Sequence, residues 1–302
     1  MNFYKKIIRS PNLRYKILDL LEFIPDKLMI NIQYRLKTGH KLSLEEPKRY
    51  TEKIQWYKLN YRDPLITQCS DKYTVRKYVE SKGLGSFLNE LYGVYDDPDE
   101  IDFDALPNSF VIKMTTGSGT NILVPDKSKM DINNVNKQLR LWMKRSNISY
   151  GREWGYYNCK RRIIIEKLLK RDSNNDIPDY KFFCFNGKVF CLYTMIDYID
   201  NSEMGRLGFF DQKFNKLPFR RADYGKLNRE IPKPKNFEKM VEIAQILSKD
   251  FPHVRVDLYN INGQIIFGET TFYNASGYTK FVPDEYDYII GEQFQLPNES
   301  RD

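Results

Sequence analysis

The sequence has few of the residues on which several kinds of active site depend. It contains only two histidines, His40 and His253, so neither a zinc site nor a histidine-based catalytic triad fits. Its cysteines are few and lack CxxC spacing, which is typical of reduced thiols in or near the core of a cytosolic protein. They are Cys69, Cys159, Cys184 and Cys191.

Long apolar segments are also missing. No run approaches the roughly 18 apolar residues of a membrane-spanning helix. The basic segment Met1–Ser10 lacks the apolar core and cleavage site of a signal peptide. We therefore expect a cytoplasmic protein. With 302 residues, of which 41% are hydrophobic, the chain is long enough for one large α/β domain or two domains, and too apolar to be disordered.

The net charge of +8 predicts an anionic partner. Nucleotide phosphates, acidic polysaccharide and anionic lipid all fit this charge, whereas no zinc finger, RNP motif or long basic helix supports nucleic acid. Between Leu13 and Lys37, apolar and basic residues alternate in two short helical segments divided at Pro25–Asp26. These helices either form a layer on the main body or lie against an anionic membrane.

The segment 254–269 predicts a β-hairpin with charged groups on one face. Apolar residues alternate with Arg255 and Asp257, as in a half-buried strand, and an Asn-Gly pair marks the reversal. A two-residue turn would place Glu269 on the face opposite Asp257. A three-residue loop, Ile261–Gly263, with a bulge at its glycine would bring Arg255, Asp257 and Glu269 together. We predict the three-residue loop.

Neighbouring carboxylates on one face disfavour each other's ionisation, and a divalent cation removes this cost. Mg²⁺ is usually held by one or two carboxylates, with water and phosphates completing the octahedron. Asp257 and Glu269 are therefore candidate Mg²⁺ ligands. The alternative is an exposed hairpin with a surface ion pair.

Two lysines lie next to small or capping residues that suit phosphate. Lys72 follows Ser70 and Asp71, which can cap a helix, and a cation in the first turn is unfavourable unless an anion binds there. Lys113 ends a short strand that enters the loop Thr115–Thr120, whose small residues could close over phosphate oxygens. A plain hairpin turn explains this loop as well.

Three later segments carry weaker signals. Arg162–Leu169 predicts a buried strand and connection whose backbone could run along an adenine edge, although a solvated strand end explains it equally well. Asp179–Tyr193 predicts a second hairpin, with Asp179 and Lys181 on one face. The polar, glycine-containing segment Tyr198–Pro232 is a candidate lid or substrate loop.

In this order the segments resemble an ATP-grasp enzyme, and more closely the TupA-like ATP-grasp family of bacterial surface-polysaccharide loci. The resemblance covers about residues 70–277. The motifs that carry it are Tyr50–Trp56, Asp71–Arg76, Gly117–Gly119, Asp179–Gly187, Arg255–Tyr259 and Gly268–Glu269.

The resemblance implies an α+β fold of ATP-grasp type, in which two α+β lobes clamp ATP. It implies an N-terminal helical extension at 1–65, a first lobe at 66–165 and a second at 166–302. On the same grounds, ATP would be bound by Lys72, Lys113, Gly117, Ser118, Gly119, Glu166, Lys167, Leu168, Leu169 and Asp179. Catalytic cations would be Lys181 and Arg255, and Mg²⁺ would be held by Asp257, Glu269 and Thr271. The usual pattern has Asn at the position of Thr271.

The implied activity is that of a carboxylate–amine ligase that forms an acyl phosphate. It would join an amino acid or amine to a uronic acid of a glycan precursor, lipid-linked or free, at the inner face of the membrane. Phosphoryl transfer depends on positioning and charge neutralisation, which agrees with the scarcity of histidine. The alternatives are a glycosyltransferase, a kinase acting on a sugar hydroxyl, and a catalytically silent binding module.

Overall fold

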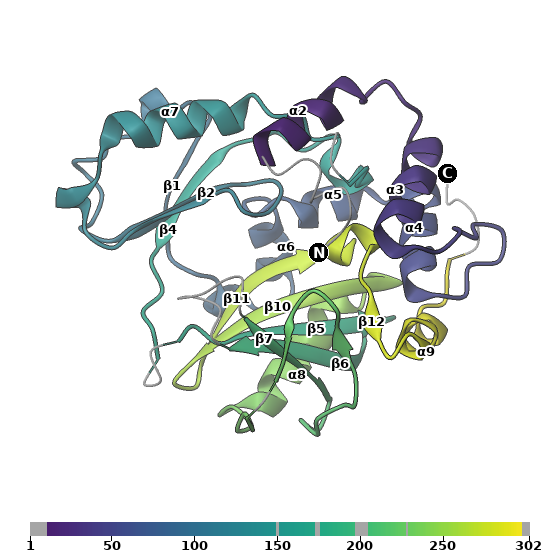
Figure 1. Ribbon diagram of the computed structural model, residues 1–302. Helices are drawn as coiled ribbons and strands as arrows, with labels where there is room; N and C mark the ends of the chain where they lie inside the picture. The colour runs from purple at the N-terminus through teal and green to yellow at the C-terminus, as the bar shows by residue number, and fades with distance from the viewer. Residues whose placement is uncertain (1–10, 149–150, 173–175, 197–204, 228, 298–302) are drawn as a thin grey trace.

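The computed structural model describes residues 11–148, 151–172, 176–196, 205–227 and 229–297. Its strands form a four-stranded sheet, a six-stranded sheet and a two-stranded sheet (Figure 1). The first has the order β1 (Leu91–Tyr95), β4 (Ile163–Lys167), β2 (Phe110–Met114) and β3 (Asn121–Val124). The second has the order β11 (Gln264–Thr271), β10 (His253–Ile261), β5 (Asp179–Phe185), β6 (Lys188–Ile196), β7 (Arg206–Asp211) and β9 (Gly225–Lys226). The smallest pairs β12 (Phe281–Val282) with β8 (Arg220–Arg221).

The first sheet has its own apolar core, covered by helix α7 (Ile132–Met143). The carboxylate of Asp131 accepts a hydrogen bond from the amide of Asn134 at 3.0 Å and caps this helix. The helix contributes three buried residues at helical spacing, Val135, Leu139 and Trp142. This sheet and helix form the first lobe.

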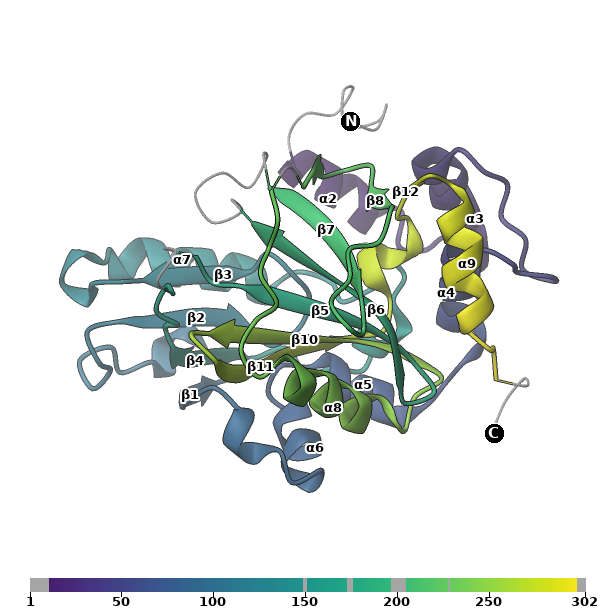
Figure 2. The ribbon, with the colours of Figure 1, turned by 90° about the horizontal axis from the view of Figure 1, so that it is seen from below.

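The second sheet packs its apolar face against helix α8 (Phe237–Ser248), which lies along it in Figure 2. Val254, Val256 and Leu258 of β10 point into this core and are fully buried. The alternate residues Arg255 and Asp257 are buried as well. Both faces of strand β10 are therefore buried, and the face that carries Arg255 and Asp257 must line a space within the protein instead of open solvent.

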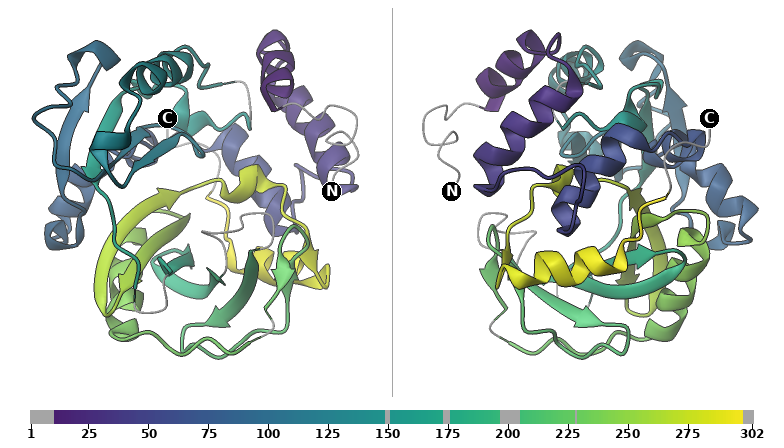
Figure 3. Two further views of the ribbon diagram at one scale, coloured as in Figure 1. Left: turned by 60° about the vertical axis from the view of Figure 1, so that its left-hand side comes forward. Right: turned by 90° about the vertical axis from the view of Figure 1, so that its right-hand side faces the viewer.

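Helices from the two ends of the described chain pack together, because α4 (Tyr50–Asn60) contacts both α3 (Asp26–Thr38) and α9 (Glu285–Gln293). Helix α2 (Pro11–Leu20) precedes α3 and lies farther from α9 (Figure 3). On α4, Tyr50, Ile54 and Tyr57 are fully buried in the core of the second lobe. The interpretation of residues 13–37 as a packed helical layer holds for the inner face of α3, where Met29, Ile30 and Tyr34 are buried.

Arg152 ties the turn between α2 and α3 to the main body. Its buried guanidinium donates to the carbonyls of Leu21, Glu22 and Ile24 and to the carboxylate of Asp26, at 2.8 to 3.1 Å. Four hydrogen bonds compensate for the burial of its charge. The remaining helices are α5 (Pro64–Ser70), α6 (Val75–Ser81) and short 3₁₀ turns at Gly85–Phe87, Pro98–Glu100, Lys127–Lys129, Trp154–Tyr156 and Asn274–Gly277.

The prediction of a three-residue loop in the β10–β11 hairpin was wrong. Ile261 pairs with Gln264, which leaves the two-residue turn Asn262–Gly263, both residues having positive φ. Asp257 nevertheless pairs with Glu269 while Leu258 pairs with Phe267, so Gly268 is the extra residue of a bulge. The predicted common face exists because the bulge lies in the strand instead of the loop.

Two further expectations need correction. Lys72 lies in a turn before α6, not in the first turn of a helix, because that helix begins at Val75. Within Tyr198–Pro232, the residues of β7 form part of the second sheet, with Leu207 and Phe209 buried, so this part of the stretch is not a lid. Part of that segment, 198–204 and 228, lies outside the described residues.

None of the helices in the described part of the chain combines the length and the apolar character needed to cross a bilayer.

Candidate active site

A cavity of about 650 Å³ lies between the two lobes, within the size range of small-molecule sites. Strands β2 and β4 and the glycine loop line it from one side, and strands β5, β10 and β11 from the other. Most of the predicted site residues contribute to its lining. They are Lys72, Lys113, Gly117, Ser118, Gly119, Glu166, Asp179, Lys181, Arg255, Asp257, Glu269 and Thr271.

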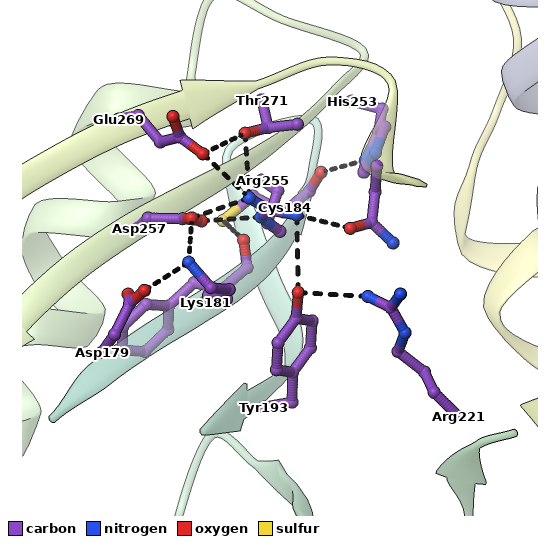
Figure 4. Close-up of polar contacts among 12 residues, drawn as sticks. Asp179, Lys181, Cys184, Tyr193, Arg221, His253, Arg255, Asp257, Glu269 and Thr271 are labelled. Carbon is purple, nitrogen blue, oxygen red and sulfur yellow. Dashed lines mark hydrogen bonds and ion pairs between the residues drawn. The ribbon is translucent and has the colours of Figure 1, made fainter. Parts of the chain in front are cut away.

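The floor of the cavity is built on the polar face of the β10–β11 hairpin (Figure 4). The guanidinium of Arg255 donates to both carboxylate oxygens of Asp257 at 2.7 Å, a bidentate pair. It also donates to Glu269 at 3.2 Å and to the hydroxyl of Thr271 at 3.0 Å. Strand alternation and the bulge at Gly268 therefore bring four polar side chains together.

Lys181 joins this floor from the neighbouring strand, where it lies opposite Asp257. Its ammonium lies 2.5 Å from a carboxylate oxygen of Asp257 and 2.5 Å from one of Asp179. Burial lowers the pKa of Lys181, but the two carboxylates outweigh burial and raise that pKa well above its ordinary value. The lysine is therefore charged in the folded protein.

The carboxylates respond differently to the same surroundings. Burial raises the pKa of Asp179 to about 6, in spite of the attraction of Lys181. Burial also acts on Glu269, but Lys72, Arg255 and Lys181 outweigh it and lower that pKa to about 2. Glu269 is therefore ionised at neutral pH. One oxygen of Asp179, Oδ1, is buried without a hydrogen-bond partner among the described residues, so it can accept a hydrogen bond from a hydroxyl group of a ligand.

The opposite wall carries further cations, from β2 of the first lobe and from the segment around the start of α6. Lys113 lies 2.8 Å from Glu166, which also accepts from Arg76 at 3.3 Å. The ammonium of Lys72 donates to the carbonyl of Gly117 at 2.6 Å, and the amide of Lys72 donates to Thr115 at 2.8 Å. Lys72 is therefore attached to the glycine loop at two points.

The glycine loop owes its shape to Gly117 and Gly119, which adopt φ of 79° and 71°. Residues with a side chain rarely adopt this left-handed backbone conformation, whereas glycine does so readily. The loop can therefore present backbone amides and the Ser118 hydroxyl to the cavity that it lines.

Three predicted residues lie apart from the cavity lining: Lys167, Leu168 and Leu169. Along β4 side chains alternate, so Glu166 points into the cavity and Lys167 points outward. The side chain of Lys167 is 55% exposed and pairs with Glu90 at 3.1 Å. The three residues begin the connection between the two sheets.

The structure also adds lining residues that the sequence did not single out for the site. Arg76 lines the cavity from the first turn of α6, whereas Lys72 precedes that helix, so their spacing gives no helical signal. Tyr193 and Asn274 come from separate segments without motif spacing, whereas Arg221 belongs to the segment 198–232 predicted as a lid or substrate loop. The Tyr193 hydroxyl lies 3.5 Å from Arg255 and 3.4 Å from Arg221, and the Asn274 side-chain oxygen also accepts from Arg255.

The histidines and cysteines stay outside this chemistry, as expected. Burial lowers the pKa of His253 to about 3, so the ring is neutral, and it stacks on Phe185. All of the cysteines are buried and free. Burial raises the pKa of each thiol, which leaves none of them a ready nucleophile.

The donor set fits Mg²⁺ better than a closed metal site. Among the described residues, no three His, Cys, Asp or Glu side chains gather as a metal cage. Asp257 and Glu269, facing each other across the hairpin, offer the one or two carboxylates with which Mg²⁺ is commonly held beside phosphates. The Thr271 hydroxyl donates to Glu269 at 3.2 Å and thereby positions that carboxylate.

Comparison with known proteins identifies the family. A family model described as TupA-like ATPgrasp matches residues 52–295, while no match is found among curated proteins. Similar solved structures include D-alanine–D-alanine ligase from Bacillus anthracis, at 16% identity and a TM-score of 0.40, over 68% of this chain and 57% of that chain. The ADP complex of PurK, N5-carboxyaminoimidazole ribonucleotide synthetase, is 14% identical with a TM-score of 0.42, over 72% of this chain and 49% of that chain. The ATP-grasp ligase PsnB with a precursor variant, Mg and ADP is 10% identical with a TM-score of 0.43, over 82% of this chain and 66% of that chain.

The chain thus spans 57% and 49% of the first two ligases. The family match extends over most of the sequence and includes both lobes that line the cavity. It confirms the expected family and its α+β fold. The chain belongs to the TupA-like ATP-grasp family.

Proposed function

We propose that this protein is an ATP- and Mg²⁺-dependent ligase that joins a carboxylate to an amine through an acyl phosphate. The observation that carries the proposal is the pair Asp257 and Glu269, opposed across one hairpin and surrounded by buried cations from both lobes. Phosphoryl transfer requires this kind of site, in which positioned charges stabilise the transferring group and no protein nucleophile takes part.

The residues divide between nucleotide and transferred group. Lys72, Lys113 and the loop Gly117–Gly119 bind phosphates, and Asp179 offers its unpaired oxygen to the ribose. Glu166, which lines the cavity, borders the adenine, and its side chain aligns Lys113. In this proposal the nucleotide lies between the lobes 66–165 and 166–302.

The catalytic cations belong to the second lobe. Lys181 and Arg255 would neutralise the transferring phosphoryl group, and Asp257 and Glu269 would hold Mg²⁺, whose positive charge would stabilise the negative charge of the phosphates. Thr271 positions Glu269 through its hydroxyl. Arg255 reaches both carboxylates, so it can keep the site assembled before the metal enters.

The substrates in this proposal are an amino acid or amine and a uronic acid of a bacterial surface-glycan precursor. The basic cavity supports an anionic acceptor, since cations from both lobes line it. The chain would act in the cytoplasm, at the inner face of the membrane, where a lipid-linked precursor is accessible.

The outer faces of α2 and α3 support this membrane contact. Lys16, Lys27 and Arg35 are exposed there, whereas Glu22 and Asp26 turn inward to Ser146 and Arg152. Basic groups beside apolar ones are typical of helices that lie on anionic lipid. The exposed apolar residues of this surface are Leu13, Leu20, Phe23, Leu28, Ile32 and Leu36.

The test is ATP turnover with Mg²⁺ against pooled amino acids and uronic-acid glycosides, with ADP, AMP and phosphate measured separately. The proposal predicts acceptor-dependent ADP and phosphate in equal amounts, with loss of both in Asp257→Asn. ADP without free phosphate would instead identify a kinase. Binding of sugar nucleotides in place of ATP would contradict the proposal and favour a glycosyltransferase.

A further inference from the structure

Glu153 is a cavity carboxylate to which the reaction described above gives no role. It lies in the segment between α7 and β4, at the start of the 3₁₀ turn Trp154–Tyr156, and lines the cavity. Its carboxylate accepts a hydrogen bond from the hydroxyl of Ser276, which follows β11 in the second lobe. Glu153 therefore joins the two lobes at the cavity wall.

The other lining carboxylates are already paired with cations. Glu166 contacts Lys113, Asp179 contacts Lys181, and Asp257 and Glu269 contact Arg255. Among the described lining residues, Glu153 is the one acid whose direct side-chain partner is a hydroxyl instead of a cation. It therefore has a negative charge to offer to a cationic ligand.

The turn that carries Ser276 is held in a strained conformation. Ala275 and Ser276 both adopt left-handed φ, 48° and 53°, which costs free energy for residues with side chains and is common at functional sites. The adjacent Gly277 has no room for a side chain, since a Cβ there would lie 2.4 Å from the side-chain nitrogen Nε2 of Gln55.

Lys58 of α4 holds the turn that carries Ser276 close to the segment that carries Glu153. Its fully buried ammonium donates to the carbonyl of Ser276 at 2.6 Å and to that of Gly151 at 2.7 Å. Gln55 donates to the carbonyls of Ser276 and Gly277 at 3.0 and 2.8 Å. The two segments that present the hydroxyl and the carboxylate are thus tied to one helix.

The surroundings also suit Glu153 to accept a proton. Burial raises its pKa, and this outweighs the opposing effects of Lys58, the Ser276 hydroxyl, Lys37 and Arg255. The other titratable groups that act on it electrostatically are Tyr156 and Tyr273. A carboxylate with a raised pKa is a stronger base at neutral pH than an ordinary one.

We propose that Glu153 binds the amine substrate as its ammonium ion and takes one proton from it before the nitrogen attacks. This inference rests on the proposed ligase function and names the group that handles the second substrate. It assigns the end of the cavity next to the turn 274–277 to a primary ammonium group. Glu153 is then a catalytic residue, while Lys58 and Gln55 are positioning residues.

The step balances as follows. The ammonium gives one proton to the Glu153 carboxylate, and the free amine attacks the carbonyl carbon of the acyl phosphate. A C–N bond forms, the C–O bond to phosphate breaks, and the second proton passes from nitrogen to the departing phosphate. The products are the amide, hydrogen phosphate and protonated Glu153, which releases its proton to solvent.

Hydroxylamine separates this role from carboxylate activation. It is largely unprotonated at neutral pH and reacts with acyl phosphates without a base. Wild type, Glu153→Gln and Glu153→Asp would each be assayed with ATP, Mg²⁺ and a uronic-acid pool, using either an amino-acid pool or hydroxylamine as acceptor. Glu45→Gln changes an exposed glutamate outside the cavity lining and is the matched control.

In Glu153→Gln the rate of amide formation relative to hydroxamate formation falls about 100-fold or more, within the usual contribution of a general base. Glu153→Asp recovers part of this ratio, and Glu45→Gln keeps the wild-type ratio. An unchanged ratio in Glu153→Gln, or parallel loss of amide and hydroxamate, overturns the inference. Absence of hydroxamate in the wild type instead contradicts the proposed ligase function itself.

Discussion

Asp257 and Glu269 lie directly opposite each other on adjacent strands, and Arg255 contacts both carboxylates. Two negative charges at this spacing are stable because buried cations surround them. In the proposed site the same pair faces Mg²⁺ and the phosphates, so the charge of each carboxylate is needed for turnover.

We expect Asp257→Asn and Glu269→Gln each to lower acceptor-dependent ADP formation about 100-fold or more, the usual cost of losing a group that stabilises transition-state charge. Steady-state kinetics over a Mg²⁺ series measure this. Glu238→Gln, on the exposed side of α8, is the control and keeps wild-type rates. Turnover above a tenth of wild type in either variant would contradict the assigned metal site.

This hairpin also shows how far the sequence predicts the site. Alternation and the order of motifs indicate which residues share a face, and the family resemblance supplies most of the cavity lining. The alternation of side chains, however, indicates only that the hairpin contains one extra residue. It does not distinguish a bulge at Gly268 from a longer loop at Gly263, because both put Asp257 and Glu269 on one face.

Residues that meet only through tertiary packing gave no signal in the sequence. Glu153 and Ser276 are far apart in the chain and touch across the cavity. Lysine is among the residues least often buried, yet Lys58 is fully buried against two backbone carbonyls. Such contacts depend on how the N-terminal helices dock, which local patterns do not encode.

The strained turn predicts a large effect at Gly277. Gly277→Ala would force a side chain into left-handed φ and against Ile54 and Gln55. We expect destabilisation of about 2–4 kcal/mol, combining backbone strain with overpacking. Gly39→Ala shares the positive φ but meets open space, so it should cost only about 1 kcal/mol. Urea unfolding compares the two, and equal losses would show that the turn is not tightly held.

His253 predicts a pH dependence of stability. Its pKa falls from 6.5 to about 3 on folding because the ring is buried. The folded state therefore binds the proton less readily than the unfolded chain, so this stability is complete above pH 6.5 and is lost as the pH falls towards 3. The contribution between pH 7 and pH 4 is about 3 kcal/mol.

The measurement is urea unfolding across this pH range. In His253→Gln the histidine part of the pH dependence should disappear, whereas His40→Gln, at a partly exposed position, should keep it. A wild-type slope in His253→Gln would show that other groups cause the acid sensitivity.

The surface of α2 and α3 predicts selective binding to anionic lipid. We expect the protein to cosediment with phosphatidylglycerol vesicles and not with phosphatidylcholine vesicles. Serine at Leu28, Ile32 and Leu36 together should weaken binding about tenfold or more, because burial of one leucine contributes roughly 1.5–3 kcal/mol. Serine at the equally exposed Leu123 and Leu141 is the control. Equal binding by both variants would place any membrane contact elsewhere.

The most direct test of the ligase proposal is transfer of oxygen from the carboxylate substrate. Once the pooled assay has identified the acid, its carboxylate is labelled with ¹⁸O and the phosphate released during turnover is analysed by mass spectrometry. An acyl phosphate requires that one labelled oxygen leaves with each phosphate, together with ADP. Unlabelled phosphate, or label recovered in AMP, would contradict the proposed reaction.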